Sequence, residues 1–144
     1  TIEKPLRLSD EIDVGSLPGI RDILQYDITF AQSEYKLLSS KVIVKAEMLM
    51  RVAYTDETGR IVSLEQRVPV SQIADTRELT DDTVCHFTFD VTESRLTARE
   101  NADGDAKLIA YDLEVTVTTR LYRNEERTVV ADAALASMPA PRMC

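Results

Sequence analysis

Residues 42–54 read VIVKAEMLMRVAY, and this stretch decides the fold class. Every even-numbered position in it is apolar, whereas Lys45, Glu47 and Arg51 lie at odd-numbered positions. Successive side chains of a β-strand point to opposite faces, so this alternation predicts a long strand with one buried face. Turn formers at 55–60 and a second alternating run at 61–70 then predict a long β-hairpin. Pro69 cannot donate a backbone hydrogen bond, so we expect it at a strand end or on a sheet edge.

Further strands are predicted at 84–91, with a less regular continuation over 92–99, and at 107–122, where β-branched residues dominate. Residues 26–30 also alternate, whereas Ile20, Ile23 and Leu24 have helical spacing. Residues 71–75 are interpreted as one helical turn or a bend, and 128–131 as a last short strand. The sequence therefore predicts an all-β fold, an antiparallel sandwich or a partly closed barrel with one or two short helical turns.

The chain length of 144 residues suits one domain. We expect an N-terminal arm at 1–19, a single β domain at 20–133 and a loose C-terminal tail at 134–144. One weak internal echo relates residues 27–34 and the strand opening KVIV at 41–44 to residues 87–94 and the opening KLIA at 107–110. This echo indicates either a duplicated half-domain or two strand pairs that are alike only because they are strands.

The balance of charge narrows the possible partners. Lys and Arg number 17 and Asp and Glu number 25, which gives a net charge of −8. Negative charge repels phosphate backbones and anionic lipid headgroups, so we expect no nucleic-acid partner. No apolar run is long enough to span a bilayer, and no signal peptide is visible at the N-terminus, so we expect no membrane insertion.

No constellation of reactive side chains stands out, and we expect no catalytic residue, no metal and no cofactor. His86 is the single histidine, and adjacent Cys85 would point to the other face of a strand, so the two cannot act as nucleophile and base. Cys85 should be a buried, inert thiol on the face of Phe87. The segment NADGD at 101–105 lacks the ligand series of a calcium loop and is interpreted as a hairpin turn.

Two features point instead to contacts with other proteins. Ile43 and Leu49 lie on the otherwise charged face of the long strand, near Arg51, and apolar anchors ringed by charge are typical of interfaces. We predict an interaction site there, although the N-terminal segment could equally cover that face. Cys144 ends the sequence and is either an accidental terminal residue or a possible interchain disulfide.

The order of segments as a whole resembles the SPOCS domain, found in spore coat and spore envelope proteins of clostridia and their relatives. The resemblance is carried by PGIRDIL at 18–24, LSSKVIVKAE at 38–47, VAYTD at 52–56, IVSLEQRVPV at 61–70 and LEVTV at 113–117. It extends over roughly residues 20–133.

The resemblance implies a non-enzymatic protein–protein interaction module in assembly of the spore coat or envelope, made in the mother-cell cytoplasm. Its partners would be other spore coat or envelope proteins or copies of itself. A cytoplasmic location is the alternative. Two other functions stay open: a self-assembling fibre or layer subunit, and a small-ligand-binding β domain that uses polar groups such as Tyr111 or His86.

Overall fold

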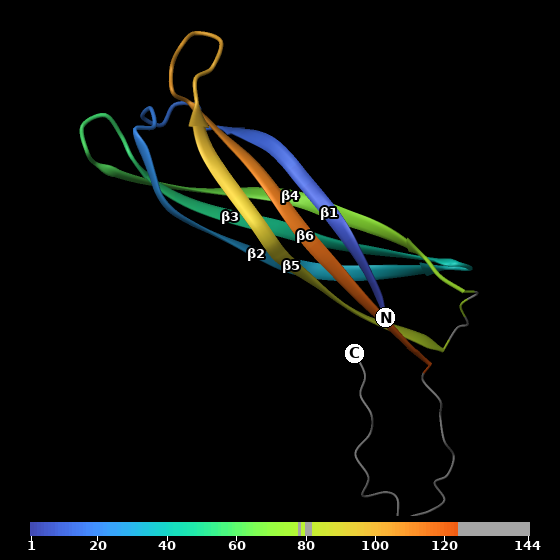
Figure 1. Cartoon of the computed structure of the whole chain (residues 1–144). Helices are drawn as coiled ribbons and strands as arrows, with labels where there is room; N and C mark the ends of the chain where they lie inside the picture. The colour runs from blue at the N-terminus through green and yellow to red at the C-terminus, as the bar shows by residue number, and fades with distance from the viewer. Residues whose placement is uncertain (78, 80–81, 124–144) are drawn as a thin grey trace, which may run out of the picture.

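The computed structural model describes residues 1–77, 79 and 82–123, which form two antiparallel three-stranded sheets packed as a sandwich (Figure 1). The six strands are β1 (Ile2–Asp13), β2 (Asp22–Leu38), β3 (Lys41–Thr55), β4 (Ile61–Asp75), β5 (Thr83–Arg99) and β6 (Leu108–Arg123). One sheet has the order β2-β3-β4 and the other β1-β6-β5. The predicted sandwich is confirmed.

The core lies between the central strands β3 and β6, which are buried at alternate positions as the period-two pattern predicts. The largest fully buried side chains are Tyr54, Met48, Met50, Ile109, Leu113, Val42, Val44, Val52, Val115 and Val117. All of them come from these two strands. The core therefore consists of two facing apolar rows, one from each sheet.

The expected helical turns are the part of the fold prediction that the structure corrects. No helix occurs at 1–77, 79 or 82–123. A bulge between Ile23 and Gln25 leaves Leu24 as an extra, exposed residue, so that Ile23 and Tyr26 both face inward. The spacing of Ile20, Ile23 and Leu24 therefore does not mark a helix: Ile20 precedes β2, and Leu24 is the extra residue of the bulge. Residues 71–75 continue β4 to its end.

A strand, β1, occupies most of the segment that we expected to be an N-terminal arm. It pairs with β6 from Ile2↔Thr119 to Asp13↔Leu108. The sequence pattern is weak here because Lys4 occupies a half-buried position between Ile2 and Leu6. Its ammonium group escapes the core by donating a hydrogen bond to Ile73 O at 3.0 Å. The domain boundaries stay a prediction.

Bulges also explain the irregular half of β5. The register shifts between Val91 and Glu93, and the inward positions change from odd to even numbers, so that Leu96 packs on the core. A comparable shift in β2 lies between Ala31 and Glu34, where Gln32 has a φ of 51°. Simple alternation fails at these points because each added residue reverses the face of all later side chains.

The two sheets have matching topology. In each, a hairpin (β2-β3 or β5-β6) supplies an edge strand and the central strand, and a third strand pairs antiparallel with the central one. The echo segments at 27–34 and 87–94 lie in β2 and β5, and both contain a bulge. Phe30 of β2 and Phe89 of β5 stack at 5.1 Å between ring centroids. The echo thus has a structural counterpart, with β1 in the place that corresponds to β4.

Candidate interaction surface

The three residues predicted as an interaction site all lie on one surface, the outward side of the β2-β3-β4 sheet. We call it the β3 outer face; its residues are Asp27, Thr29, Lys36, Leu38, Ile43, Lys45, Glu47, Leu49, Arg51, Glu65, Arg67, Pro69 and Ile73. The odd-numbered residues of β3 point to this face because the even-numbered ones fill the core.

Three apolar side chains gather at one end of the β3 outer face, whereas Ile61 lies on the same side of the sheet at the other end of β4. Ile43 pairs with Ile73 of β4, and Leu38 lies diagonally across from Ile43 on β2. Ile73 is 52% exposed and Leu38 is 40% exposed, whereas Ile43 is half-buried. We call Leu38, Ile43 and Ile73 the apolar patch. The N-terminal segment does not cover it, because β1 belongs to the other sheet.

Ion pairs occupy the middle of the same face. Arg51 Nε lies 3.1 Å from Glu65 Oε1, and Arg67 Nη1 lies 2.9 Å from Glu47 Oε1. Leu49 is half-buried between Thr29 and Arg67 in the register of the strands. The predicted residue Arg51 is therefore already paired within the sheet. It lies near Leu49 on β3 but far from Ile43 and the rest of the apolar patch.

The surface of this sheet is hollowed at two places. A hollow of about 650 Å³ is lined by residues that include Asp27, Arg51 and Glu65. A second, of about 480 Å³, is lined by residues that include Lys45, Pro69 and Ser71. Both are lined by charged side chains of either sign.

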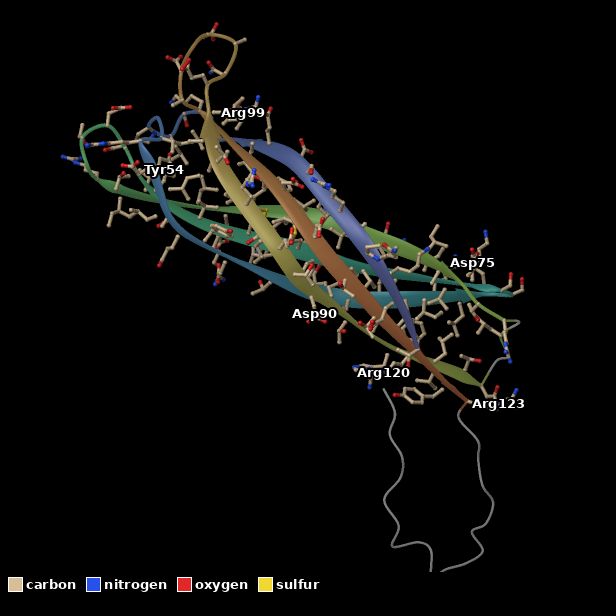
Figure 2. All side chains as sticks on the ribbon, viewed as in Figure 1. Tyr54, Asp75, Asp90, Arg99, Arg120 and Arg123 are labelled. Carbon is tan, nitrogen blue, oxygen red and sulfur yellow. The ribbon has the colours of Figure 1, made fainter. Side chains whose placement is uncertain are left out.

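The outward side of the other sheet is built differently. Arg7 Nε and Nη2 donate to Asp112 at 3.0 and 2.7 Å, and Ser9 Oγ donates to Asp112 Oδ1 at 2.8 Å. The Arg7 and Ser9 hydrogen bonds hold the pKa of the Asp112 carboxyl below its usual value. Thr116 and Thr118 continue the same row on β6. This β6 outer face (Arg7, Ser9, Thr88, Asp90, Asp112, Thr116, Thr118 and Arg120) is polar; Figure 2 labels Asp90 and Arg120 on it.

Each of the four edge strands carries a feature that hinders the addition of another strand. Pro5 in β1 and Pro69 in β4 each lack a backbone donor, and β2 and β5 contain the bulges described above. Side chains also tie the open sides of the sandwich together. Tyr26 Oη and Ser94 Oγ lie 2.6 Å apart between β2 and β5, and Lys4 links β1 to β4.

The side chains considered for chemistry do not converge. Cys85 is buried at 3% exposure, as predicted, whereas His86 is exposed on the opposite face of β5. Tyr111 is buried in the core. Within residues 1–77, 79 and 82–123, no group of three or more His, Cys, Asp or Glu side chains is placed to hold a metal ion.

The segment at 101–105 is a turn, as predicted. Asn101 Oδ1 accepts hydrogen bonds from the backbone N–H groups of Asp103 and Asp105, and Gly104 has a φ of 82°. These bonds use the side chain that a calcium loop would turn toward the ion.

The site prediction was incomplete, and part of it lies outside the described residues. Leu38 and Ile73 were missed, although extending the alternation of 61–70 to residue 75 would have placed Ile73 on the outward side of its strand. Cys144 and the strand predicted at 128–131 lie outside the described residues, so the interchain disulfide stays a prediction.

The chain is thus a small β-sandwich whose two outer faces carry different side chains. Comparison with family models gives a match to "SipL, SPOCS domain" over residues 19–98, which is more than half of the chain. The chain belongs to the SPOCS domain family, which relates it to sporulation. No curated protein and no solved structure matches the chain. Because the described residues form strands and turns, they include no helix that could span a membrane.

Proposed function

We propose that this protein is a non-enzymatic interaction module that acts in assembly of the spore coat or envelope by binding a partner protein on the β3 outer face. Family membership supplies the sporulation context. The observation that carries the proposal is the apolar patch of Leu38, Ile43 and Ile73 beside a row of ion pairs.

Elementary energetics supports this use of the patch. Covering exposed apolar surface stabilises a complex by roughly 25 cal/mol for each Å² removed from water. The pairs Arg67–Glu47 and Arg51–Glu65 follow the patch along the same face, and charged groups outside the apolar centre of an interface select the partner and its orientation. On the outward side of the other sheet, Tyr122 is 42% exposed and pairs with Val84 near the end of β6, whereas the middle of that side carries the hydrogen-bonding side chains of Arg7, Ser9, Asp112, Thr116 and Thr118.

The arrangement of reactive groups supports a role without catalysis. His86 and Cys85 project from opposite faces of β5, and the Tyr111 side chain is packed within the core. A nucleophile must lie within hydrogen-bonding reach of its base, and these groups are separated by the sheet itself. The separation of these groups supports a role in binding rather than in bond making.

A matched pair of variants tests the proposal. Ile73→Ser removes an apolar group from the patch, and Ile61→Ser makes the same change at the other end of β4, outside the patch. We expect tagged Ile73→Ser protein to lose its association with developing spores at least about tenfold, the effect of roughly 1.4 kcal/mol. Ile61→Ser should associate like the original chain.

Fluorescence microscopy and fractionation of sporulating cells provide the measurement, with thermal unfolding to show that both variants are folded. Equal association of Ile73→Ser and Ile61→Ser with the spore would contradict use of this patch. A chain that does not associate with the spore at all would contradict the proposed role in the coat or envelope.

A further inference from the structure

We propose that β1 is exchanged between two copies of this chain, so that β1 of each copy pairs with β6 of the other. This inference deepens the proposed function by naming a second copy as one partner. It also gives the pairing a definite register, Ile2↔Thr119 to Asp13↔Leu108 across two chains instead of within one.

The topology carries the first argument. In the β2-β3-β4 sheet, the third strand follows the central strand through the turn at 56–60. In the β1-β6-β5 sheet, the corresponding place is filled by β1, which comes from the opposite end of the chain and starts beside the end of β6 (Figure 1). The strand that completes this sheet is therefore not tied to it by a hairpin, and a β1 from another copy can fill the same place.

The features of the edge strands also favour exchange over the addition of a strand. Pro5, Pro69 and the bulges of β2 and β5 hinder the addition of a new strand to the finished sandwich. They do not hinder replacement of β1, because the partner strand of β1 is the central strand β6, whose pairing with β1 is continuous over twelve residue pairs. Among residues 1–77, 79 and 82–123, exchange of β1 is thus the route to strand pairing between copies that these features do not hinder.

The connection between β1 and β2 is built as a hinge. Residues 14–21 cross from one sheet to the other and include Gly15, at a φ of 61°, and the Pro18-Gly19 pair. In the closed form, the two ends of this segment are held by the buried side chains of Val14 and Ile20 and by backbone hydrogen bonds, from Val14 N–H to Lys107 O at 2.9 Å, from Ile20 N–H to Ala106 O at 2.8 Å and from Arg21 N–H to Thr55 O at 2.7 Å. Side chains hold its middle. Tyr54 Oη donates to Pro18 O at 2.7 Å, and Lys107 Nζ donates to Gly15 O at 3.3 Å and to Leu17 O. Opening of the hinge changes these contacts and leaves the β1–β6 ladder intact.

Exchange preserves nearly everything that stabilises β1. Leu6, Leu8 and Ile12 would pack on the same core positions, and Arg7 would meet the same Asp112 carboxylate, now in the other chain. Domain swapping is a low-cost route to dimers for this reason. The balance between the closed and the exchanged forms then depends on the hinge contacts and on protein concentration.

A disulfide between chains tests the register directly. Glu3 and Thr118 are paired on the outward side of β1 and β6. In a Cys144→Ser background, two single variants, Glu3→Cys and Thr118→Cys, are unfolded, mixed, refolded together under reducing conditions and then oxidised. Buried Cys85 is shielded in the folded chain. Exchange brings the two introduced thiols together only between chains, so we expect a covalent heterodimer whose yield rises with refolding concentration.

A second pair of variants controls for chance contact. Glu3→Cys is mixed with Glu114→Cys, which pairs with Arg7 and so lies four positions out of register. A disulfide needs Cα atoms within about 7 Å, and we expect about tenfold more heterodimer from the in-register pair. The double variant Glu3→Cys/Thr118→Cys in one chain closes a disulfide in either form and shows that oxidation is complete. Equal yields from the two mixtures, or no heterodimer from either, would overturn the exchange.

A hinge variant adds an independent readout. Tyr54→Phe combined with Lys107→Ala removes the bonds to Pro18 O, Gly15 O and Leu17 O. If β1 exchanges, this variant refolds to a larger fraction of dimer on light scattering, by at least about twofold, because the closed hinge loses its anchors. An unchanged dimer fraction contradicts the hinge. If no exchange is found but Ile73→Ser still fails to associate with the spore, the proposed function stands. The two proposals therefore fail separately.

Discussion

The two sheets present nearly interchangeable inner faces and very different outer faces. Inward, β3 contributes a row of buried Val, Met and Tyr side chains, and β6 contributes a row of buried Val, Ile, Leu and Tyr side chains. Outward, β6 carries threonine and the bonded group Arg7, Ser9 and Asp112, whereas β3 and its neighbours carry the apolar patch and open hollows. Packing demands apolar side chains on both inner faces, whereas it leaves the chemistry of the outer faces free to differ, and it is on the β3 outer face that we propose a partner binds.

The largest expected effect tests the equality of the inner faces. Leu113→Ala in β6 and Met50→Ala in β3 each leave a cavity at a fully buried position. Each should lower the free energy of unfolding by about 2–5 kcal/mol, measured by chemical denaturation. Thr97→Ala at an exposed position of β5 serves as control and should change it by less than about 0.5 kcal/mol. A small effect in one strand only would show that the two sheets do not share one core.

A smaller effect is expected where the two sheets are joined by the hinge. Tyr54→Phe keeps the buried ring and removes the hydrogen bond to Pro18 O. We expect a loss of about 0.5–1.5 kcal/mol in the free energy of unfolding. Tyr26→Phe, which removes the contact with Ser94 at an open side of the sandwich, should cost less because water can replace the bond. The reverse order would contradict the role of Tyr54 as the hinge anchor.

Acid should weaken both halves of the molecule. The hydrogen bonds from Thr58 and Arg60 lower the pKa of Asp56 in the turn after β3, and those from Arg7 and Ser9 lower the pKa of Asp112 in β6. The unfolded chain therefore takes up protons first as pH falls below the ordinary value of 3.8. The stability that these two carboxylates contribute is fully present above that pH, and it is lost as the pH falls through their pKa values in the folded state. Asp112→Asn should flatten this decline in urea unfolding series between pH 5 and about 2; an unchanged slope would contradict the assignment.

The smallest effects are expected when the ion pairs of the two outer faces are removed. Arg51→Ala removes a single exposed contact with Glu65 and should cost between 0 and about 1 kcal/mol of unfolding free energy. Arg7→Ala removes a two-bonded contact with Asp112, which also holds Ser9, and should cost more. Thermal unfolding at low and high salt measures both. Equal losses would show that the β6 outer face is no better ordered than the β3 outer face.

Much of the fold and part of the site could be predicted from particular residues. The alternation at 42–54 and 107–122 predicted β3 and β6, and the odd-numbered positions of β3 placed Ile43, Leu49 and Arg51 on one face. The alternating pattern fails at Leu24, Gln32 and Thr92. Each of them lies in or beside a bulge, and local alternation does not predict bulges. Ile73 was missed because its partner across the sheet is a matter of register, which depends on the whole hairpin.

By itself, the sequence determined that this chain builds strands with one apolar face, since that pattern is local and depends only on the alternation of side chains along the backbone. Beyond the hairpin predicted at 42–54 and 61–70, only the tertiary structure decided which strands pair and in which register. It placed β1 beside β6 rather than leaving it as an arm, and it brought Ile73 next to Ile43. Those pairings join residues far apart in the sequence, and the free energy that selects among them comes from burying both inner faces at once.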